Sequence, residues 1–214
     1  PAHRATLEKM RTALHGQTLR IKDNGLLPEG SALEGYDASH APGAWDIEKV
    51  YALACLASDR DPANLPRFIA ALSDPSEPMR WWGAQGCTIL GAKAAGAEVA
   101  LRQALDDKSG GVAAAAAEAL VRIGKPAGAL KTLERLVQLK AEDGTVMQAA
   151  NVLDRLGESA RPSLPLMKEV FAGEASVKLE GGKYAPTHIL KHTIDVLEGR
   201  VDALVYPDVS QLAK

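Results

Sequence analysis

Residues 72–91 read LSDPSEPMRWWGAQGCTILG, and the architecture predicted for the chain follows from this segment. Turn formers, Ser73 to Ser76, follow Leu72, and a run of apolar and small residues then continues to Leu90. Gly91 comes directly after it, and glycine is the usual residue just past a helix end, because it adopts the left-handed conformation without a Cβ clash. The stretch therefore predicts a tight turn and then a helix that ends at Leu90.

The same pattern recurs along the chain at an almost constant interval. Residues that end an apolar helix are separated by 34, 33, 33 and 41 positions; they are Leu56, Leu90, Ile123, Leu156 and Leu197. Glycine follows the middle three, as Gly91, Gly124 and Gly157. A period in this range is the mark of stacked structural repeats.

Each of these helices has one apolar or small-residue face. The positions three and seven residues before the helix ends are Cys87, Leu120, Leu153, Ile194, Gly83, Ala116, Ala149 and Leu190. This spacing lies on one side of a helix. Shorter amphipathic segments precede the helices, at 65–72, 99–105, 130–139 and 164–171. Each unit is therefore predicted to be a helix, a tight turn and a second helix, and because so small a pair cannot bury its own apolar face, neighbouring pairs must stack.

Composition excludes several classes of protein. The chain has 214 residues, of which 46% are hydrophobic and only 4% aromatic, which favours closely packed helices over sheets and excludes general disorder. The formal net charge of −2 provides no large positive field, so we expect no nucleic-acid partner. Apolar runs are too short for a membrane span, and two cysteines cannot form a disulfide framework.

The turn and the helix after it carry a resemblance. Asp74-Pro75 leading through Met79-Arg80 to a small-residue helix is similar to a HEAT repeat of the HEAT-like subtype. The unit at 97–124 follows the pattern with different turn residues, the unit at 126–157 is more divergent, and the last is interrupted around 173–182 by a small hairpin or a loop. The resemblance implies an all-α protein, a short right-handed α-solenoid of HEAT-like helical hairpins.

The order of the parts resembles a larger family. Residues 1–30 hold an amphipathic helix and the motif Asp23-x-Gly25-Leu26-Leu27-Pro28-Glu29. An irregular connection at 31–46, repeats over 47–199, in which Tyr184-Ala185-Pro186 opens the last helix, and a tail at 200–214 follow. This order is similar to the C-terminal extension of bacterial sulfatases of the heparan N-sulfatase-like group. The segment Gly25 to Pro28 alone is equally well explained as a helix stop.

The resemblance implies a sulfatase parent whose catalytic domain lies upstream, so this chain itself would be non-catalytic. In that family the nucleophile is a formylglycine made from Cys or Ser in a Cys-x-Pro-Ser-Arg type motif. The nearest match, Cys55 to Arg60, has its Arg one position too late, so no catalytic residue carries over. Cys55 and Cys87 are interpreted as small buried apolar residues. The parent would be periplasmic or secreted, and the sequence leaves open whether the chain is a fragment or a whole protein.

A second set of positions, five and nine residues before the helix ends, lies off the apolar face. Stacking would align them as columns on one surface, which in HEAT arrays is the concave side. The predicted interaction surface is Trp81, Gln85, Glu118, Met147, Asn151, His188 and His192. For the adjacent tryptophans we expect Trp82 to be packed and Trp81 to be partly exposed.

Three functions remain open. The first is a non-catalytic accessory domain that packs on or orients the sulfatase catalytic domain or contacts a sulfated glycan. The second is an independent HEAT-repeat scaffold that binds a protein through its concave face. The third is a metal enzyme centred on His188 and His192, which are spaced i, i+4 but lack the Glu of His-Glu-x-x-His and an evident third ligand. We therefore predict no catalytic residue, no metal and no cofactor; the Gly-rich pieces lack the features of a phosphate-binding loop.

Overall fold

The computed structural model describes residues 3–139, 144–175 and 187–202. These residues form helices joined by turns and short 3-10 segments, and none of them is in a strand. The expectation of an all-α protein is confirmed. None of the helices in these ranges combines the length and apolar composition that crossing a lipid bilayer requires.

The helix ends predicted at Leu90, Leu156 and Leu197 are confirmed, and those predicted at Leu56 and Ile123 fall at Ser58 and Arg122. The second helices of the pairs are α3 (Ile47–Ser58), α5 (Glu77–Leu90), α7 (Gly110–Arg122), α9 (Gly144–Leu156) and α11 (Thr187–Leu197). The first helices are α4 (Leu65–Ala71), α6 (Glu98–Ala104), α8 (Ala129–Val137) and α10 (Leu164–Ala175). Short 3-10 segments connect or precede helices: η1 (Asn24–Leu26), η2 (Pro62–Asn64), η3 (Gly91–Ala97) and η4 (Gly157–Ser163).

Local chemistry sets these boundaries. Gly91, Gly124 and Gly157 have φ angles of 55°, 79° and 51°, the left-handed region expected just past a helix end. At the other end of α7, the Ser109 hydroxyl accepts a hydrogen bond from the backbone N–H of Val112 at 3.3 Å. Such N-caps satisfy a donor that the first helical turn leaves unpaired.

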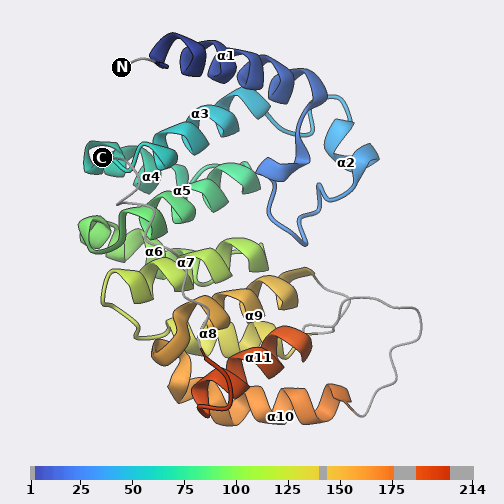
Figure 1. The fold of residues 1–214 in the computed structure, drawn as a ribbon, viewed down its shortest axis with the longest axis vertical. Coiled ribbons are helices and arrows are strands. Elements are labelled where there is room, and N and C mark those ends of the chain that lie inside the picture. The colour runs from blue at the N-terminus through green and yellow to red at the C-terminus, as the bar shows by residue number, and fades with distance from the viewer. Residues whose placement is uncertain (1–2, 140–143, 176–186, 203–214) are drawn as a thin grey trace.

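The helices stack along the long axis of the molecule, from α1 (Arg4–Ile21) at one end to α10 at the other (Figure 1). Each second helix packs against its own first helix and against the second helices next to it: α5 contacts α3, α4 and α7, and α7 contacts α6, α8 and α9. Farther along, α9 contacts α11, and α11 contacts α10.

The predicted apolar face forms the interior. All eight residues at the positions three and seven before the helix ends are buried. The helix α7 is buried without interruption from Gly111 to Leu120, and Ala113 to Ala117 lie within this stretch. Small side chains allow α7 to lie close to helices on all sides, so the core around it is dense with few aromatic residues.

One crossing shows how close the helices come. A Cβ built on Gly83 of α5 would lie 2.8 Å from the carbonyl oxygen of Phe68, and one on Gly86 would lie 2.5 Å from the Phe68 ring. Both glycines are therefore required by the approach of α4 to α5 rather than by a turn.

The connection at 31–46 contains more regular structure than expected. Within 31–46, expected to be irregular, residues Tyr36–His40 form the short helix α2, and Trp45 is buried with its Nε1–H donating to the carbonyl oxygen of Ser39 at 3.0 Å. The interruption around 173–182 and Tyr184-Ala185-Pro186 lie wholly or largely outside the described residues, as does most of the tail at 200–214.

Candidate functional site

Residues 23–30, which we call the strap, connect α1 to the rest of the chain and lie across the second helices. The Trp82 Nε1–H of α5 donates to the carbonyl oxygen of Leu26 at 2.9 Å, and the Gln148 side chain of α9 donates to the carbonyl oxygen of Glu29 at 2.5 Å. Between them, a Cβ on Gly111 of α7 would lie 3.3 Å from the Pro28 ring. The sequence motif therefore does more than end a helix: it spans three helix pairs.

The first turn of the strap has a simple local cause. The Asp23 carboxylate accepts a hydrogen bond from the backbone N–H of Gly25 at 2.9 Å, which caps the 3-10 turn Asn24–Leu26. At the other end Gly30 has a φ of 71°, and a Cβ there would lie 2.7 Å from the backbone nitrogen of Thr145. The strap therefore ends in contact with the start of α9.

Three of the seven predicted surface residues meet in one cavity beneath the strap, which we call the Trp81 cavity. Its volume is about 220 Å³. The residues that line it are Leu27, Glu29, Trp81, Gln85, Ala115, Gln148, Asn151, Val152 and Arg155. The predicted residues Trp81, Gln85 and Asn151 thus share one site, although they come from α5 and α9.

The polar groups of this cavity are not saturated. The Nε1–H of Trp81 is buried and has no hydrogen-bond acceptor within the described part of the chain. A buried donor without an acceptor costs about 1–3 kcal/mol, and such an atom calls for an explanation. Among the described residues, the side-chain amides of Gln85 and Asn151 also make no hydrogen bond. The amides of Gln85 and Asn151 are therefore available to a ligand, whereas the Trp81 N–H is enclosed by protein.

The two tryptophans differ in the hydrogen bonding of their indole groups. Trp81 and Trp82 are both half-buried against the core, and their rings meet edge to face at 5.2 Å between centroids. Trp81 is thus partly exposed, as expected, and Trp82 packs against the core, as expected, without being fully buried. What separates them is the indole N–H, since Trp82 donates to the strap and Trp81 donates to nothing described.

Glu118 does not lie on an exposed surface, contrary to the prediction. It is only 3% exposed, because α7 is enclosed by its neighbours. Its carboxylate accepts hydrogen bonds from Arg155 Nη2 at 2.6 Å and from Arg122 Nη2 at 3.3 Å. Arg122 Nη2 also donates to the carbonyl oxygen of Arg155 at 3.2 Å. Glu118 therefore joins α7 to α9 through Arg155, whose side chain, like that of Arg122, remains in contact with water.

The other predicted residues lie apart from the Trp81 cavity. Met147 is half-buried, His188 is exposed, and His192 is half-buried with its Nδ1 at 2.8 Å from Asp154 Oδ1. Within the described ranges no three His, Cys, Asp or Glu side chains are grouped so as to hold a metal ion. The structure therefore supplies no third ligand for His188 and His192 from these residues.

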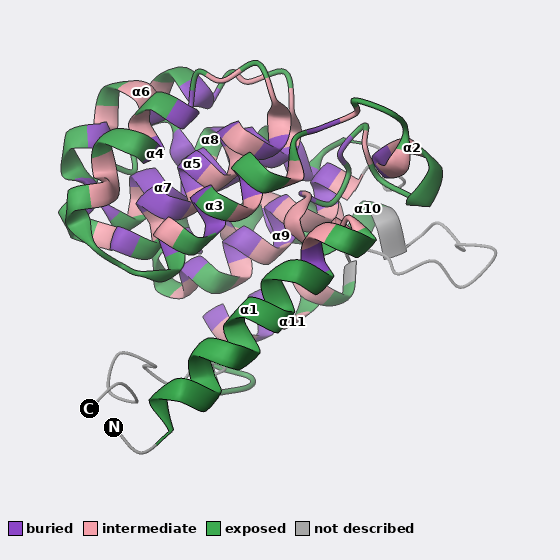
Figure 2. Ribbon diagram, turned by 90° about the horizontal axis from the view of Figure 1, so that it is seen from above, coloured by how far each residue is buried: buried purple, intermediate pink, exposed green. Residues whose placement is uncertain are grey.

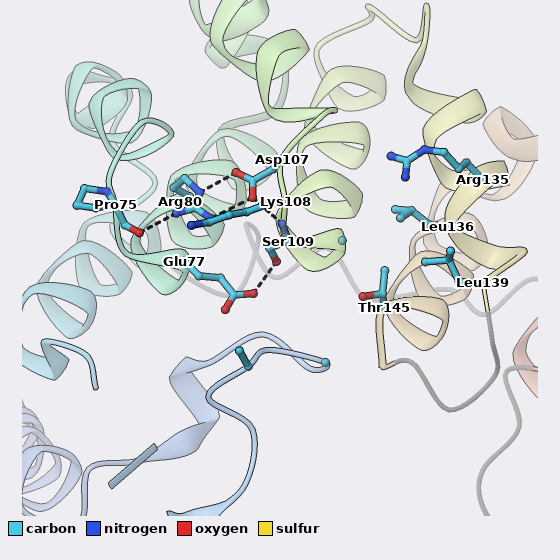
Figure 3. A pocket seen from close by; sticks show the side chains of 13 residues that line it. Pro75, Glu77, Arg80, Asp107, Lys108, Ser109, Arg135, Leu136, Leu139 and Thr145 are labelled. Carbon is cyan, nitrogen blue, oxygen red and sulfur yellow. Dashed lines mark hydrogen bonds and ion pairs between the residues drawn. The ribbon is translucent and has the colours of Figure 1, made fainter. Parts of the chain in front are cut away.

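A larger cavity of about 530 Å³ opens at the starts of α5, α7 and α9 (Figure 3). Arg80 and Asp107 form a buried pair there, with Nε and Nη2 donating at 2.6 and 3.0 Å. The pKa of the Arg80 guanidinium is raised, chiefly because of its hydrogen bond to Asp107. Figure 3 shows Arg135 set apart from this pair, across the cavity.

The remaining carboxylate of this cavity is also paired. The hydroxyls of Ser31 and Ser109 donate to the two oxygens of Glu77, at 2.6 and 2.5 Å. Because these polar groups bind one another, they act as a joint between helix pairs and the N-terminal segment. The larger cavity is thus a weaker candidate for ligand recognition than the Trp81 cavity.

The two cysteines have opposite environments. Cys87 is fully buried, as predicted, and burial raises the pKa of its thiol to about 12. Cys55 is exposed, so the prediction that it is buried is wrong. It lines a pocket between α1 and α3 with His15 and Tyr51, and the pKa of Tyr51 is raised by burial first and by Cys55 second. The ring of Tyr51 stacks on His15 of α1 with centroids 4.7 Å apart.

The helix α1 presents an apolar stripe to the outside. Leu7, Met10 and Leu14 lie on one side of it and are 47%, 65% and 61% exposed. Only Thr18 of this helix is buried. Figure 2 shows α1 exposed along most of its length and projecting beyond the stacked helices. The amphipathic pattern predicted for this helix is therefore not used within the described part of the chain.

Comparison with known proteins gives no family assignment. No protein-family model matches the chain, and no curated protein matches it.

Proposed function

We propose that this chain is a non-catalytic accessory module of a bacterial sulfatase, built as a short right-handed α-solenoid of HEAT-like hairpins. Two observations support the solenoid. The helix ends recur every 32 to 34 residues from α3 to α9, and each second helix packs on the next, as α3, α5, α7 and α9 do in order. Stacking of similar neighbours is the packing rule of helical-repeat proteins.

The exposed apolar stripe on α1 is the observation that supports an accessory role. Four of the nine exposed large hydrophobic residues in the described ranges belong to this one helix: Leu7, Met10, Leu14 and Ile21. A continuous apolar stripe on a helix that otherwise contacts water marks a protein contact. The sulfatase resemblance places a catalytic domain before this helix, so we take that domain as the partner that covers the stripe.

The independent scaffold remains the alternative. It would bind a protein through the concave face, to which the sequence assigns Trp81, Gln85 and Asn151. The strap lies over part of this face and takes up the Trp82 N–H, which leaves a small cavity rather than an open surface. This arrangement favours the accessory role over broad protein binding.

The test starts with the coding sequence upstream of Pro1, where we expect a sulfatase catalytic domain with a Cys-x-Pro-Ser-Arg type motif. Hydrogen exchange is then measured on the whole polypeptide and on residues 1–214 alone. Amides of α1 should exchange more slowly in the whole polypeptide, because the catalytic domain covers the stripe. The helix α6, with its exposed Val99, is the matched control and should not change.

The contact can be tested further by replacing Leu7, Met10 and Leu14 together with serine. In the whole polypeptide this variant should lose the additional protection of α1, whereas Val99→Ser should keep it. Equal exchange of α1 in the two unsubstituted proteins, absence of a sulfatase domain upstream, or hydrolysis of an aryl sulfate by residues 1–214 alone would each overturn the proposal.

A further inference from the structure

We infer that the Trp81 cavity holds one sugar ring of a glycan and recognises its hydroxyl groups rather than its sulfate. The inference deepens the proposed function and rests on it for the kind of polymer. It is carried by the chemistry of the cavity walls, which belong to α5, α7, α9 and the strap.

Size and shape fit a single ring. The cavity, with a volume of about 220 Å³, has room for a group larger than a single water molecule. A cavity of this size is too small for a peptide helix or for a folded partner. It is also bounded on one side by Leu27 and Glu29 of the strap, so only a slender part of a polymer can enter.

The walls combine apolar surface with unused hydrogen-bonding groups. Trp81, Ala115 and Val152 supply an aromatic and aliphatic surface of the kind that packs against the C–H groups of a sugar ring. Gln85 and Asn151 each offer an amide donor and an amide acceptor. The Trp81 N–H is enclosed by protein, so recognition of a ligand falls to these two amides. A polyhydroxylated ring matches this mixture, because every hydroxyl both donates and accepts.

The charges argue against sulfate as the recognised group. Arg155 is the one cation that lines the cavity, and its Nε and Nη2 already donate to Glu118 at 3.2 and 2.6 Å. Glu29 lines the same cavity and contributes a negative charge. With one cation already bound to a carboxylate and a second carboxylate nearby, the site has no net positive charge to attract an anion.

Isothermal titration calorimetry on residues 1–214 tests this with two oligosaccharides of the same glucosamine–uronic acid backbone, one unsulfated and one fully sulfated. Both should bind with Kd values within about threefold of each other. Raising the salt from about 0.15 M to about 0.5 M should change either Kd by less than about threefold, since no ionic contact is broken.

Two variants probe the unpaired amides while keeping the shape of the cavity. Asn151→Leu keeps the branched shape and removes the amide, and Gln85→Met keeps the length and removes the amide. Each should weaken binding by about tenfold or more. Gln103→Met is the matched control, because Gln103 is exposed on α6 and lies outside the cavity. Circular dichroism and urea unfolding establish that each variant is folded.

The outcomes separate this inference from the proposed function. The inference fails if neither oligosaccharide binds, or if only the sulfated one binds and salt abolishes that binding. Hydrogen exchange of α1 in the whole polypeptide then still tests the accessory role separately. Equal weakening by Gln103→Met would also overturn the assignment to this cavity. If the unsulfated oligosaccharide binds but α1 shows no protection, the cavity stands and the sulfatase context fails.

Discussion

At the scale of single residues, the two thiols give a direct test of the packing. Cys55 is exposed on α3, whereas Cys87 is fully buried and burial holds its pKa at about 12. Because the thiolate is the reactive form, iodoacetamide at about pH 8.5 should modify Cys55 and leave Cys87 intact. Mass spectrometry should find one adduct in the native protein and two in urea.

The variant Cys55→Ser is the control for this labelling and should take up no label while folded. Native labelling of that variant would show that α5 is not enclosed as described.

Glu118 shows why a position cannot be assigned to the surface from its type alone. A carboxylate off the apolar face suggests exposure, yet Glu118 is buried because Arg122 and Arg155 supply its hydrogen bonds. Arg155 lies 37 residues later in the sequence, and the spacing of apolar residues does not indicate that it contacts Glu118. The signal that could have found the contact is the recurrence of arginine on α7 and α9 near the helix ends.

We expect Glu118→Ala to lower the free energy of unfolding by about 1–3 kcal/mol, because two partly exposed guanidinium groups lose their acceptor. The loss is smaller than for a fully buried pair, since both arginines retain access to water. Urea denaturation measures it. Leu120→Ala, in the core of the same helix, should cost about 2–5 kcal/mol, and an effect of Glu118→Ala near zero would contradict the buried network.

At the scale of helices, the sequence predicted most of what the structure contains. The period of 33 or 34 residues, the glycines after α5, α7 and α9 and the buried face all follow from local chemistry that repeats. The strap was not predictable in the same way. Its motif occurs once, and its partners, Trp82, Gly111 and Gln148, are distant in sequence, so no local rule connects them. Leu27 and Glu29 of the strap also line the Trp81 cavity, so this cavity was not predictable from local rules either.

The crossing of α4 and α5 provides a prediction about helical glycines. In Gly83→Ala the new methyl group would lie 2.8 Å from the Phe68 carbonyl oxygen, and backbone cannot move aside cheaply. We expect a loss of about 1–3 kcal/mol in the free energy of unfolding. Gly16→Ala on α1 is the counterpart: a Cβ there meets nothing within 4 Å, so the change should stabilise by about 0.5–1 kcal/mol. Thermal unfolding of both variants compares them, and similar signs would refute the close approach.

The last helix contributes stability that depends on pH. The pKa of Asp195 is lowered, first by its hydrogen bond from Lys191 and then by the charge of Arg200. The pKa of Glu198 is lowered first by Lys168 of α10. A carboxyl group with a lowered pKa in the folded state stabilises above its unfolded pKa, near 4, and this stabilisation is lost as the pH falls through the folded pKa.

The free energy of unfolding should therefore decrease between about pH 5 and pH 3. Asp195→Asn should make this decrease shallower in urea titrations at a series of pH values. Asp37→Asn should leave it unchanged, because Asp37 is exposed and makes no ion pair among the described residues. If the free energy of unfolding of Asp195→Asn decreases at low pH as steeply as that of the unsubstituted protein, the contacts of Asp195 do not contribute to stability.

At the scale of the whole molecule, the strap connects helix pairs that are otherwise linked only to their neighbours. Gly30 allows this, because its φ is 71° and a Cβ would lie 2.7 Å from the backbone nitrogen of Thr145. Gly30→Ala should detach the strap from α9, expose the strap to limited proteolysis and remove one wall of the Trp81 cavity. Gly35→Ala is the control, since its φ is 92° but a Cβ there meets nothing within 4 Å. Equal cleavage rates in the two variants would mean that backbone strain alone, and not the contact with α9, is responsible.

The reach of residues 23–30 also limits how this architecture can change. Open arrays of helix pairs gain pairs by duplication and lose them by deletion, because each pair contacts only its neighbours. Here a peptide of fixed length must reach from Trp82 to Gln148, so inserting or removing a pair between them would leave it too short or too long. The length of residues 23–30 therefore fixes the number of helix pairs between α5 and α9. Further pairs could be added only outside that interval.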